Sequence, residues 1–82
     1  MVKVEFIHDF QKLFSKIKDK NIKEKIIKQF AKIRDDPEIG KPMMYSRKGT
    51  REVYVAPYRL SYSYDKESDT IYFLDLYHKD KQ

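Results

Sequence analysis

The sequence predicts a single small α+β domain in which two helices cover one face of an antiparallel sheet. Three observations predict this class. Apolar residues first alternate with polar ones, then recur with a helical period, and alternate again from residue 51 onward. The expected order of elements is therefore β-α-α-β-β-β. A chain of 82 residues has the length of one domain, and we expect residues 1–82 to form it.

The N-terminal segment predicts a strand followed by a helix. Residues 2–6 alternate between apolar and charged side chains, as in a half-buried strand. The helix is indicated by an apolar stripe with the spacing i, i+3, i+4, i+7, made by Phe10, Leu13, Phe14 and Ile17. Asp9 is the expected N-cap, because its carboxylate can accept the free backbone N–H groups of the first turn.

A second amphipathic helix follows a tight turn at residues 18–21. Its apolar face consists of Ile22, Ile26, Phe30 and Ile33. The opposite face carries Lys23, Lys25, Lys28 and Lys32, a row that is typical of a solvated surface. Asp36-Pro37 should end the helix, because proline disfavours the helical conformation in the residue before it. Two such helices joined by a short turn form an αα-hairpin.

Residues 41–51 read KPMMYSRKGTR and form the most positive stretch of the chain. Lys41, Arg47, Lys48 and Arg51 lie here without any acidic residue, and the proline, serine and glycine predict a loop. Tyr45 has two interpretations, since its ring can stack on a nucleic-acid base or pack on its own loop.

Three strands are expected at about residues 51–55, 59–64 and 70–77. Ala56-Pro57 separates the first two, and the polar residues 65–69 form a hairpin loop before the third. The short connections predict an antiparallel meander. The N-terminal strand must join the same sheet, because its backbone groups would otherwise lack partners.

Strand parity assigns side chains to the two faces of this sheet, because successive side chains point to opposite sides. We expect the helices to cover the apolar set, which is Val53, Val55, Leu60, Tyr62, Tyr64, Tyr72, Leu74 and Leu76. The open face then carries the other set, which is Glu52, Tyr54, Arg59, Ser61, Ser63, Asp75, Tyr77 and Lys79.

The open face suits RNA, which needs positive charge for its phosphates and aromatic rings for its unstacked bases. The formal net charge of +5 also favours a polyanionic partner, although 38% charged residues is equally typical of a thermophile's surface. Structural interpretations stay open: an Arg59–Asp75 ion pair, Tyr54 and Tyr77 as ordinary strand residues, and a solvated His78.

Several classes of site and location are disfavoured by composition. The chain has no cysteine and only two distant histidines, so we expect no metal site and no disulfide. We find no phosphate-binding loop, paired metal carboxylates or nucleophile–base motif, and we expect no cofactor. No apolar run is long enough to span a membrane, and the N-terminus lacks the apolar core of a signal peptide, so a cytoplasmic location is expected.

Three stretches together resemble the RelE/ParE toxin superfamily, its archaeal members above all. They are IRDDPEIGKPM (33–43), REVYVAPYRLSYSY (51–64) and IYFLDLYHKDKQ (71–82). They contain an Asp-Pro helix stop, an arginine before an LxY pattern and a basic pair near the end of the last strand. The resemblance covers nearly the whole chain, and it rests on the order and spacing of these motifs.

The resemblance implies a ribosome-dependent mRNA endoribonuclease that cuts the codon in the A site, where the RNA's own 2′-hydroxyl attacks the adjacent phosphate. Arg59 matches the arginine that holds the scissile phosphate. Lys79 and His78 match the basic residues that end the last strand, and Glu52 is a candidate base. The RNA-binding set is Lys41, Arg47, Lys48, Arg51, Tyr54, Tyr77 and Lys81.

The resemblance also implies partners and carries departures. A RelB-type antitoxin should bind the chain in a hetero-oligomer, and ribosomal RNA and mRNA are the other expected partners. Two lysines of the family's best-known member have Thr50 and Glu52 as counterparts here, and its relatives' C-terminal tyrosine has none before Gln82. The alternatives are a ParE-like gyrase inhibitor without nuclease activity and a non-catalytic RNA- or ribosome-binding module.

Overall fold

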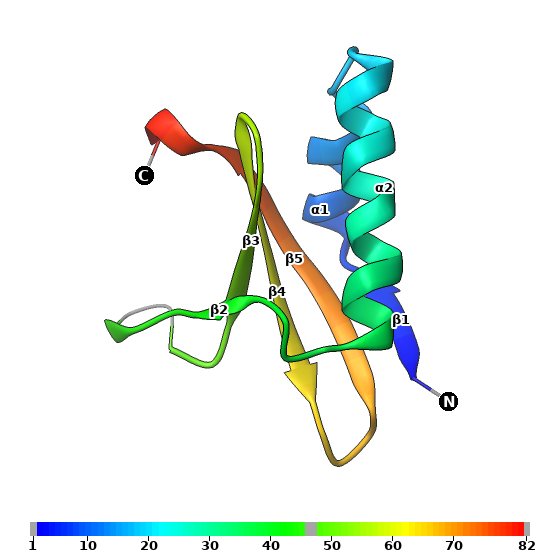
Figure 1. The fold of residues 1–82 in the computed structure, drawn as a ribbon, viewed down its shortest axis with the longest axis vertical. Helices are drawn as coiled ribbons and strands as arrows, with labels where there is room; N and C mark the ends of the chain where they lie inside the picture. Colours follow the sequence, from blue (N-terminus) through cyan, green and yellow to red (C-terminus); the bar gives the residue numbers. More distant parts are fainter. Residues whose placement is uncertain (1, 46–47, 82) are drawn as a thin grey trace.

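The computed structural model describes residues 2–45 and 48–81 and confirms the expected α+β class. Its elements are β1 (Lys3–Phe6), α1 (His8–Ser15), α2 (Lys20–Asp35), β2 (Lys41–Pro42), β3 (Arg51–Val55), β4 (Tyr58–Asp65), β5 (Thr70–His78) and the 3-10 helix η2 (Lys79–Lys81). The strands form one sheet in the order β1-β5-β4-β3-β2. Figure 1 shows both helices on one side of this sheet.

The last three long strands form the predicted antiparallel meander, and β1 joins it as expected. β3 pairs with β4 and β4 with β5 in antiparallel register, whereas β1 runs parallel to β5. The stretch 41–51, expected to be a loop throughout, begins with the short strand β2, which pairs with β3. No helix in the described residues is long and apolar enough to cross a membrane.

The core lies between the helices and the sheet. It consists of Phe10, Ile17, Ile26, Ile33, Val55, Leu60, Tyr62, Ile71, Phe73 and Leu76. The helical members recur at the spacing that puts them on one face, so this stripe is removed from water when the helices pack on the strands.

The helix ends differ from the sequence prediction in two places. α1 begins at His8 with Ile7 as its N-cap, so Asp9 lies in the first turn and is not the cap. The reason is the preceding strand: the Ile7 N–H donates to the Phe73 carbonyl, which fixes where the chain leaves the sheet. α1 also ends at Ser15, earlier than expected, so Ile17 belongs to the connection between the helices, where it is still buried. In the same connection Asp19 caps α2 by accepting from the Asn21 and Ile22 N–H groups.

A β-bulge changes the face of two residues in β5. Tyr72 and Leu74, expected beneath the helices, are only half-buried, whereas Ile71 and Phe73 are fully buried. The register explains this, because Ser61 pairs with Asp75 but the next residue, Tyr62, pairs with Phe73. The extra residue in β5 inverts the parity on one side of the irregularity. Leu76, beyond it, is buried as expected.

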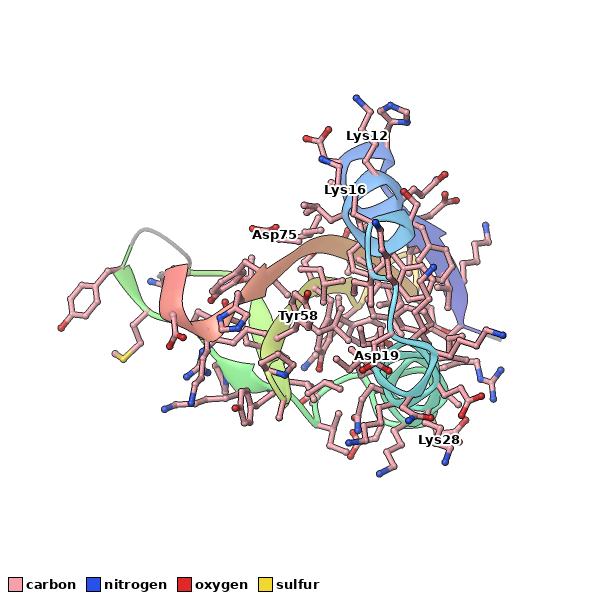
Figure 2. The ribbon with its side chains drawn as sticks, turned by 90° about the horizontal axis from the view of Figure 1, so that it is seen from above. Lys12, Lys16, Asp19, Lys28, Tyr58 and Asp75 are labelled. Atoms are coloured by element: carbon pink, nitrogen blue, oxygen red, sulfur yellow. The ribbon has the colours of Figure 1, made fainter. Side chains whose placement is uncertain are left out.

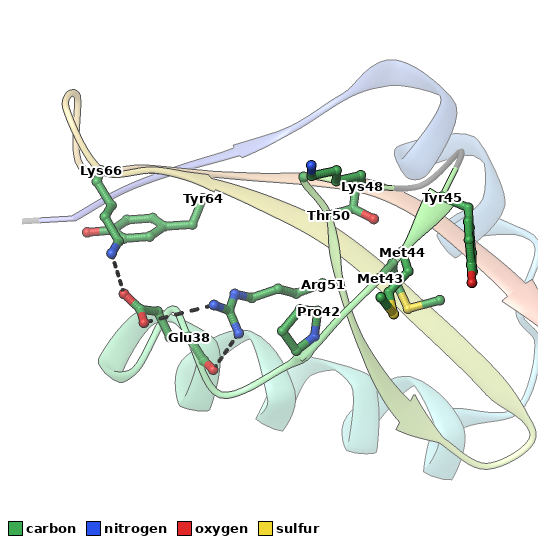
Figure 3. A pocket seen from close by; sticks show the side chains of 11 residues that line it. Glu38, Pro42, Met43, Met44, Tyr45, Lys48, Thr50, Arg51, Tyr64 and Lys66 are labelled. Atoms are coloured by element: carbon green, nitrogen blue, oxygen red, sulfur yellow. Dashed lines mark hydrogen bonds and ion pairs between the residues drawn. The ribbon is translucent and has the colours of Figure 1, made fainter.

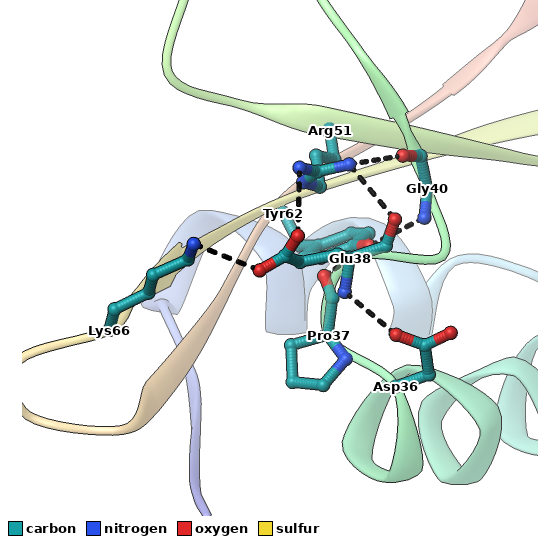
Figure 4. Close-up of polar contacts among 7 residues, drawn as sticks. All are labelled: Asp36, Pro37, Glu38, Gly40, Arg51, Tyr62 and Lys66. Atoms are coloured by element: carbon teal, nitrogen blue, oxygen red, sulfur yellow. Dashed lines mark hydrogen bonds and ion pairs between the residues drawn. The ribbon is translucent and has the colours of Figure 1, made fainter.

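A polar cluster fastens the connection between α2 and β2 to the sheet (Figure 4). The buried Tyr62 hydroxyl donates to the Pro37 carbonyl at 2.8 Å and accepts from the Gly40 N–H at 2.9 Å. Arg51 Nη1 donates to the carbonyls of Glu38 and Gly40 at 2.9 and 2.8 Å. A Cβ on Gly40 would lie 2.7 Å from the Tyr62 hydroxyl, so only glycine fits this approach.

Tyr62→Phe should lower the free energy of unfolding by about 1–3 kcal/mol, because it leaves two backbone groups without their hydroxyl partner. Urea unfolding measures this, with Tyr64→Phe as the control that removes one bond to Asp69 at a hairpin. Burial raises the pKa of Tyr62 above its ordinary 10.0. The wild type should therefore keep the stability contributed by the Tyr62 hydroxyl at neutral pH and lose it only as the pH rises above 10.0. Equal free energies of unfolding for Tyr62→Phe and wild type at neutral pH would contradict the hydrogen bonds described.

Candidate nucleic-acid interface

Arg59 lies near the start of β4, the middle strand of the sheet, on the face opposite the helices. The register places it opposite Tyr54 of β3 and opposite Tyr77 of β5, and paired residues project from the same face. Its guanidinium carbon is 5.6 Å from the centre of the Tyr54 ring, within the range of a cation–π contact. The strands thus bring together one arginine and two tyrosines that the sequence analysis assigned to this face.

A carboxylate lies beside this arginine and is bonded to one of the tyrosines. The Tyr77 hydroxyl donates to Glu52 Oε2 at 2.6 Å, a length typical of a hydrogen bond to an ionised carboxylate. Glu52 is only 5% exposed and pairs with Ser61 on β4. The Tyr77–Glu52 hydrogen bond joins β5 to β3 across the intervening strand β4 and holds both side chains in fixed orientations.

These residues border a depression of about 330 Å³, which we call the Arg59 depression. Its lining consists of Lys41, Met43, Glu52, Tyr54 and Arg59. β2 supplies Lys41 by pairing it with Glu52, so the short strand that the sequence analysis missed completes the rim. The depression offers a forked cation, a second cation, a carboxylate and an aromatic ring, a set suited to a phosphate group and its nucleoside.

The basic end of β5 is not brought into this depression. His78 pairs with Tyr58 in the register, so by strand alternation it projects from the face opposite to that of Arg59. Its ring lies 5.8 Å from that of Tyr58, and its Nδ1 is 3.5 Å from Asp80 Oδ2. Lys79 is exposed and belongs to η2, beyond the end of the strand, so strand parity does not fix its direction.

The remaining residues of the predicted RNA-binding set are dispersed. Arg51 belongs to the polar cluster below α2, where its Nη2 is 3.9 Å from Glu38 Oε2. Lys48 is exposed in the β2–β3 connection. Arg47 and the Lys81 side chain lie outside what the structure describes.

Asp75 lies near α1. It borders a second depression, of about 380 Å³, with Lys12 of α1 and Lys16, the C-cap of that helix (Figure 2). Its Oδ1 accepts from the Leu76 N–H at 2.8 Å.

The structure also reveals an aromatic groove that the sequence analysis treated only as core. All five phenylalanines form one cluster, with contacting ring centres 4.7–6.3 Å apart. Four of them, Phe6, Phe10, Phe14 and Phe30, line with Gln11 a surface groove of about 440 Å³ between the helices. The helical spacing of Phe10 and Phe14 predicted part of this stripe, but it could not show that the second helix leaves it partly open.

Within residues 2–45 and 48–81, no three or more histidine, cysteine, aspartate or glutamate side chains gather as a possible metal site.

Comparisons with known proteins give a family and a fold. Residues 1–82 match the family model described as the ParE toxin of the type II toxin–antitoxin system parDE. The toxin–antitoxin complex RelBE2 of Mycobacterium tuberculosis contains a chain that is 25% identical, with a TM-score of 0.83 and coverage of 95% of this chain and 98% of that one. No curated protein sequence matches.

Two further solved structures share the fold. The isolated Escherichia coli RelE toxin is 15% identical, with a TM-score of 0.80 over 95% of this chain and 84% of that chain. The archaeal RelE–RelB complex of Pyrococcus horikoshii contains a chain that is also 15% identical, with a TM-score of 0.79 over 99% and 98%.

Proposed function

We propose, from the premise that the chain belongs to the family of ParE toxins of type II toxin–antitoxin systems, that it stops translation in the cytoplasm by cutting mRNA on the ribosome. One observation carries this proposal: Arg59 lies in a depression with Lys41 and between two tyrosines, beside a carboxylate. The similarity to the RelE chain of RelBE2 supports the mRNA-cleaving branch of the superfamily over the gyrase-inhibiting branch. A purely protein-binding toxin has no need of this combination on an otherwise open sheet face.

The proposed reaction uses the RNA's own 2′-hydroxyl as nucleophile and needs no cofactor. The Arg59 fork binds two oxygens of the scissile phosphate and stabilises the charge that develops on them. Tyr77 accepts the proton of the 2′-hydroxyl while it passes its own proton to Glu52, along the 2.6 Å hydrogen bond. The 2′-oxygen forms the new bond to phosphorus, the bond to the 5′-oxygen breaks, and that oxygen takes a proton from solvent. Lys79, beyond the end of β5, is left to contact a neighbouring phosphate, whereas His78 projects from the opposite face and takes no part in this scheme.

We propose that the antitoxin partner binds the aromatic groove between α1 and α2. Phe6, which lines the groove, is 38% exposed, and Ile27, three residues before the groove residue Phe30 on α2, is 51% exposed. Exposed apolar side chains grouped on one surface mark an interaction site. Lys23 lies over the Phe14 ring at 5.3 Å, at the border of the groove. An amphipathic helix with apolar residues toward the groove and acidic residues beside them matches both features. We propose that a RelB-type antitoxin supplies this helix and forms a hetero-oligomer with the toxin.

Gyrase inhibition is the second candidate function, and the ParE family model favours it. The discriminating experiment adds the purified chain to a translating extract that contains a supercoiled plasmid and DNA gyrase. Our proposal expects the mRNA to be cut while gyrase activity on the plasmid is unchanged. Intact mRNA with inhibited gyrase would replace our proposal with the ParE activity. Ribosome binding that inhibits translation without a cut would support the non-catalytic module.

The exposed Lys41 of β2 and Lys48 of the β2–β3 connection should contribute to ribosome binding through phosphates. Lys41→Ala and Lys48→Ala should each weaken co-sedimentation with ribosomes and reduce the salt dependence of binding by about one charge. Lys25→Ala, on the solvated face of α2, is the matched control and should leave both unchanged. Binding that is insensitive to salt, or equally weakened by the control, would contradict an electrostatic anchor in this connection.

A further inference from the structure

Tyr45 is the most exposed of the large apolar and aromatic side chains that the structure describes. Its exposed fraction is 89%, so its ring contributes almost nothing to the core. Its backbone φ is +60°, a left-handed conformation that favours glycine or asparagine over a bulky residue. The fold therefore bears a conformational cost here and gains no burial from the ring. Strain that packing does not explain is found at functional positions.

The backbone around Tyr45 is held in place by hydrogen bonds. The Lys48 N–H donates to the Tyr45 carbonyl at 3.0 Å, and the Met43 N–H donates to the Thr50 carbonyl at 3.0 Å. β2, which leads to Tyr45, lies at the edge of the sheet, on the side away from the helices (Figure 1). The ring is thus presented to solvent from a residue whose carbonyl is held by a hydrogen bond.

A large hollow begins at this ring and adjoins the Arg59 depression. It measures about 700 Å³ and includes Met43, Met44, Tyr45 and Lys48 in its lining. Figure 3 shows Tyr45 at one end of this hollow, far from the Glu38 and Lys66 side chains at the other. Met43 lines both the hollow and the Arg59 depression. Tyr45 follows Met43 by two residues, and two residues of extended chain span at most about 7 Å. Tyr45 is therefore close enough to contact the nucleotide next to one bound in the Arg59 depression.

We propose that Tyr45 is a stacking platform for an unpaired RNA base, with the Lys48 ammonium near the phosphate of the same nucleotide. This inference rests on the proposed function, and it extends the RNA contact from the Arg59 depression along the β2–β3 connection. Residues 41–51 contain four basic side chains and no acid, a composition that fits a polyanion. A flat exposed ring among such charges is the arrangement by which single-stranded RNA is held without regard to sequence.

The test measures binding of unstructured, end-labelled RNA of about ten nucleotides by fluorescence anisotropy. Tyr45→Asn removes the ring and retains a residue that tolerates a positive φ. It should raise the Kd roughly 5- to 150-fold, the range that base–aromatic stacking gives. Tyr45→Phe keeps the ring and should bind within about twofold of wild type. The melting temperature of Tyr45→Asn should not fall, since the ring is not part of the core.

Two further arms separate the sources of RNA and the rival explanations. Co-sedimentation with empty ribosomes measures binding to ribosomal RNA. If Tyr45→Asn weakens binding only in that arm, the stacked base belongs to the ribosome, which supports the same stacking chemistry. Ile39→Ala, which removes another side chain that is 49% exposed, controls for general apolar loss. Unchanged affinity of Tyr45→Asn in both arms, or an equal loss in Tyr45→Phe, would overturn the proposal. Both arms measure affinity alone, so they are informative whether or not the wild type cuts mRNA.

Discussion

Arg59→Ala is expected to slow mRNA cleavage on the ribosome roughly 100- to 1000-fold and to abolish growth arrest on expression. The loss corresponds to about 2.7–4 kcal/mol of transition-state stabilisation, by analogy with the removal of one oxyanion-hole donor. The large effect follows from the position of Arg59 in its depression, where its fork can meet two oxygens of a phosphate. The measurement is single-turnover cleavage of a labelled mRNA on programmed ribosomes.

The fold should tolerate this change. One contact that the change removes is that with the Tyr54 ring, which is worth about 0.5–1 kcal/mol at an exposed site. Arg59→Lys is the matched variant: it keeps the charge, loses the planar fork, and should retain an intermediate rate. Growth arrest by Arg59→Ala at wild-type strength would show that Arg59 is structural, and the site assignment would be wrong.

Ile27→Glu is expected to weaken antitoxin binding by at least about 2 kcal/mol, roughly 30-fold in Kd. Ile27 is 51% exposed on the helical stripe that also carries Lys23 and Phe30, which border the aromatic groove. A carboxylate there is buried without a partner and opposes the acidic residues expected on the antitoxin. Titration calorimetry with the product of the neighbouring reading frame measures the effect.

Ile39→Glu is the control, because Ile39 has nearly the same exposure, 49%, and lies outside the groove, in the connection after α2. It should bind the antitoxin as the wild type does. Since the antitoxin binds only the folded toxin, a concentration about 100 times the Kd should raise the melting temperature of the wild type by roughly 10–20 °C. Equal binding by Ile27→Glu and wild type would place the antitoxin elsewhere.

The sequence was sufficient for the parts of the site that depend on strand alternation alone. Glu52 and Tyr54 lie two apart on β3, and Arg59 follows a short hairpin, so their shared face needed only the period of two. Tyr77 lies on the same side of the bulge as Arg59, so its face was also predictable. The Tyr77–Glu52 hydrogen bond was not predictable, because it spans two strands whose register the sequence does not state.

The errors have local physical causes. The extra residue at the bulge in β5 reversed the expected faces of Tyr72 and Leu74. Arg51 looked like part of the basic loop, yet backbone carbonyls of Glu38 and Gly40 engage it below α2, and no periodic pattern reports such a contact. The resemblance grouped His78 and Lys79 with Arg59, whereas strand alternation puts His78 on the opposite face and Lys79 begins η2.

The most direct test of the proposed function is the chemistry of the cut ends. A labelled mRNA is incubated with the purified toxin, once free in solution and once on ribosomes with a defined codon in the A site, and the products are mapped. Attack by the 2′-hydroxyl predicts a cut within that codon only on the ribosome, a 2′,3′-cyclic phosphate on one fragment and a 5′-hydroxyl on the other. Uncut ribosome-bound mRNA, or fragments that carry a 5′-phosphate, would contradict the account.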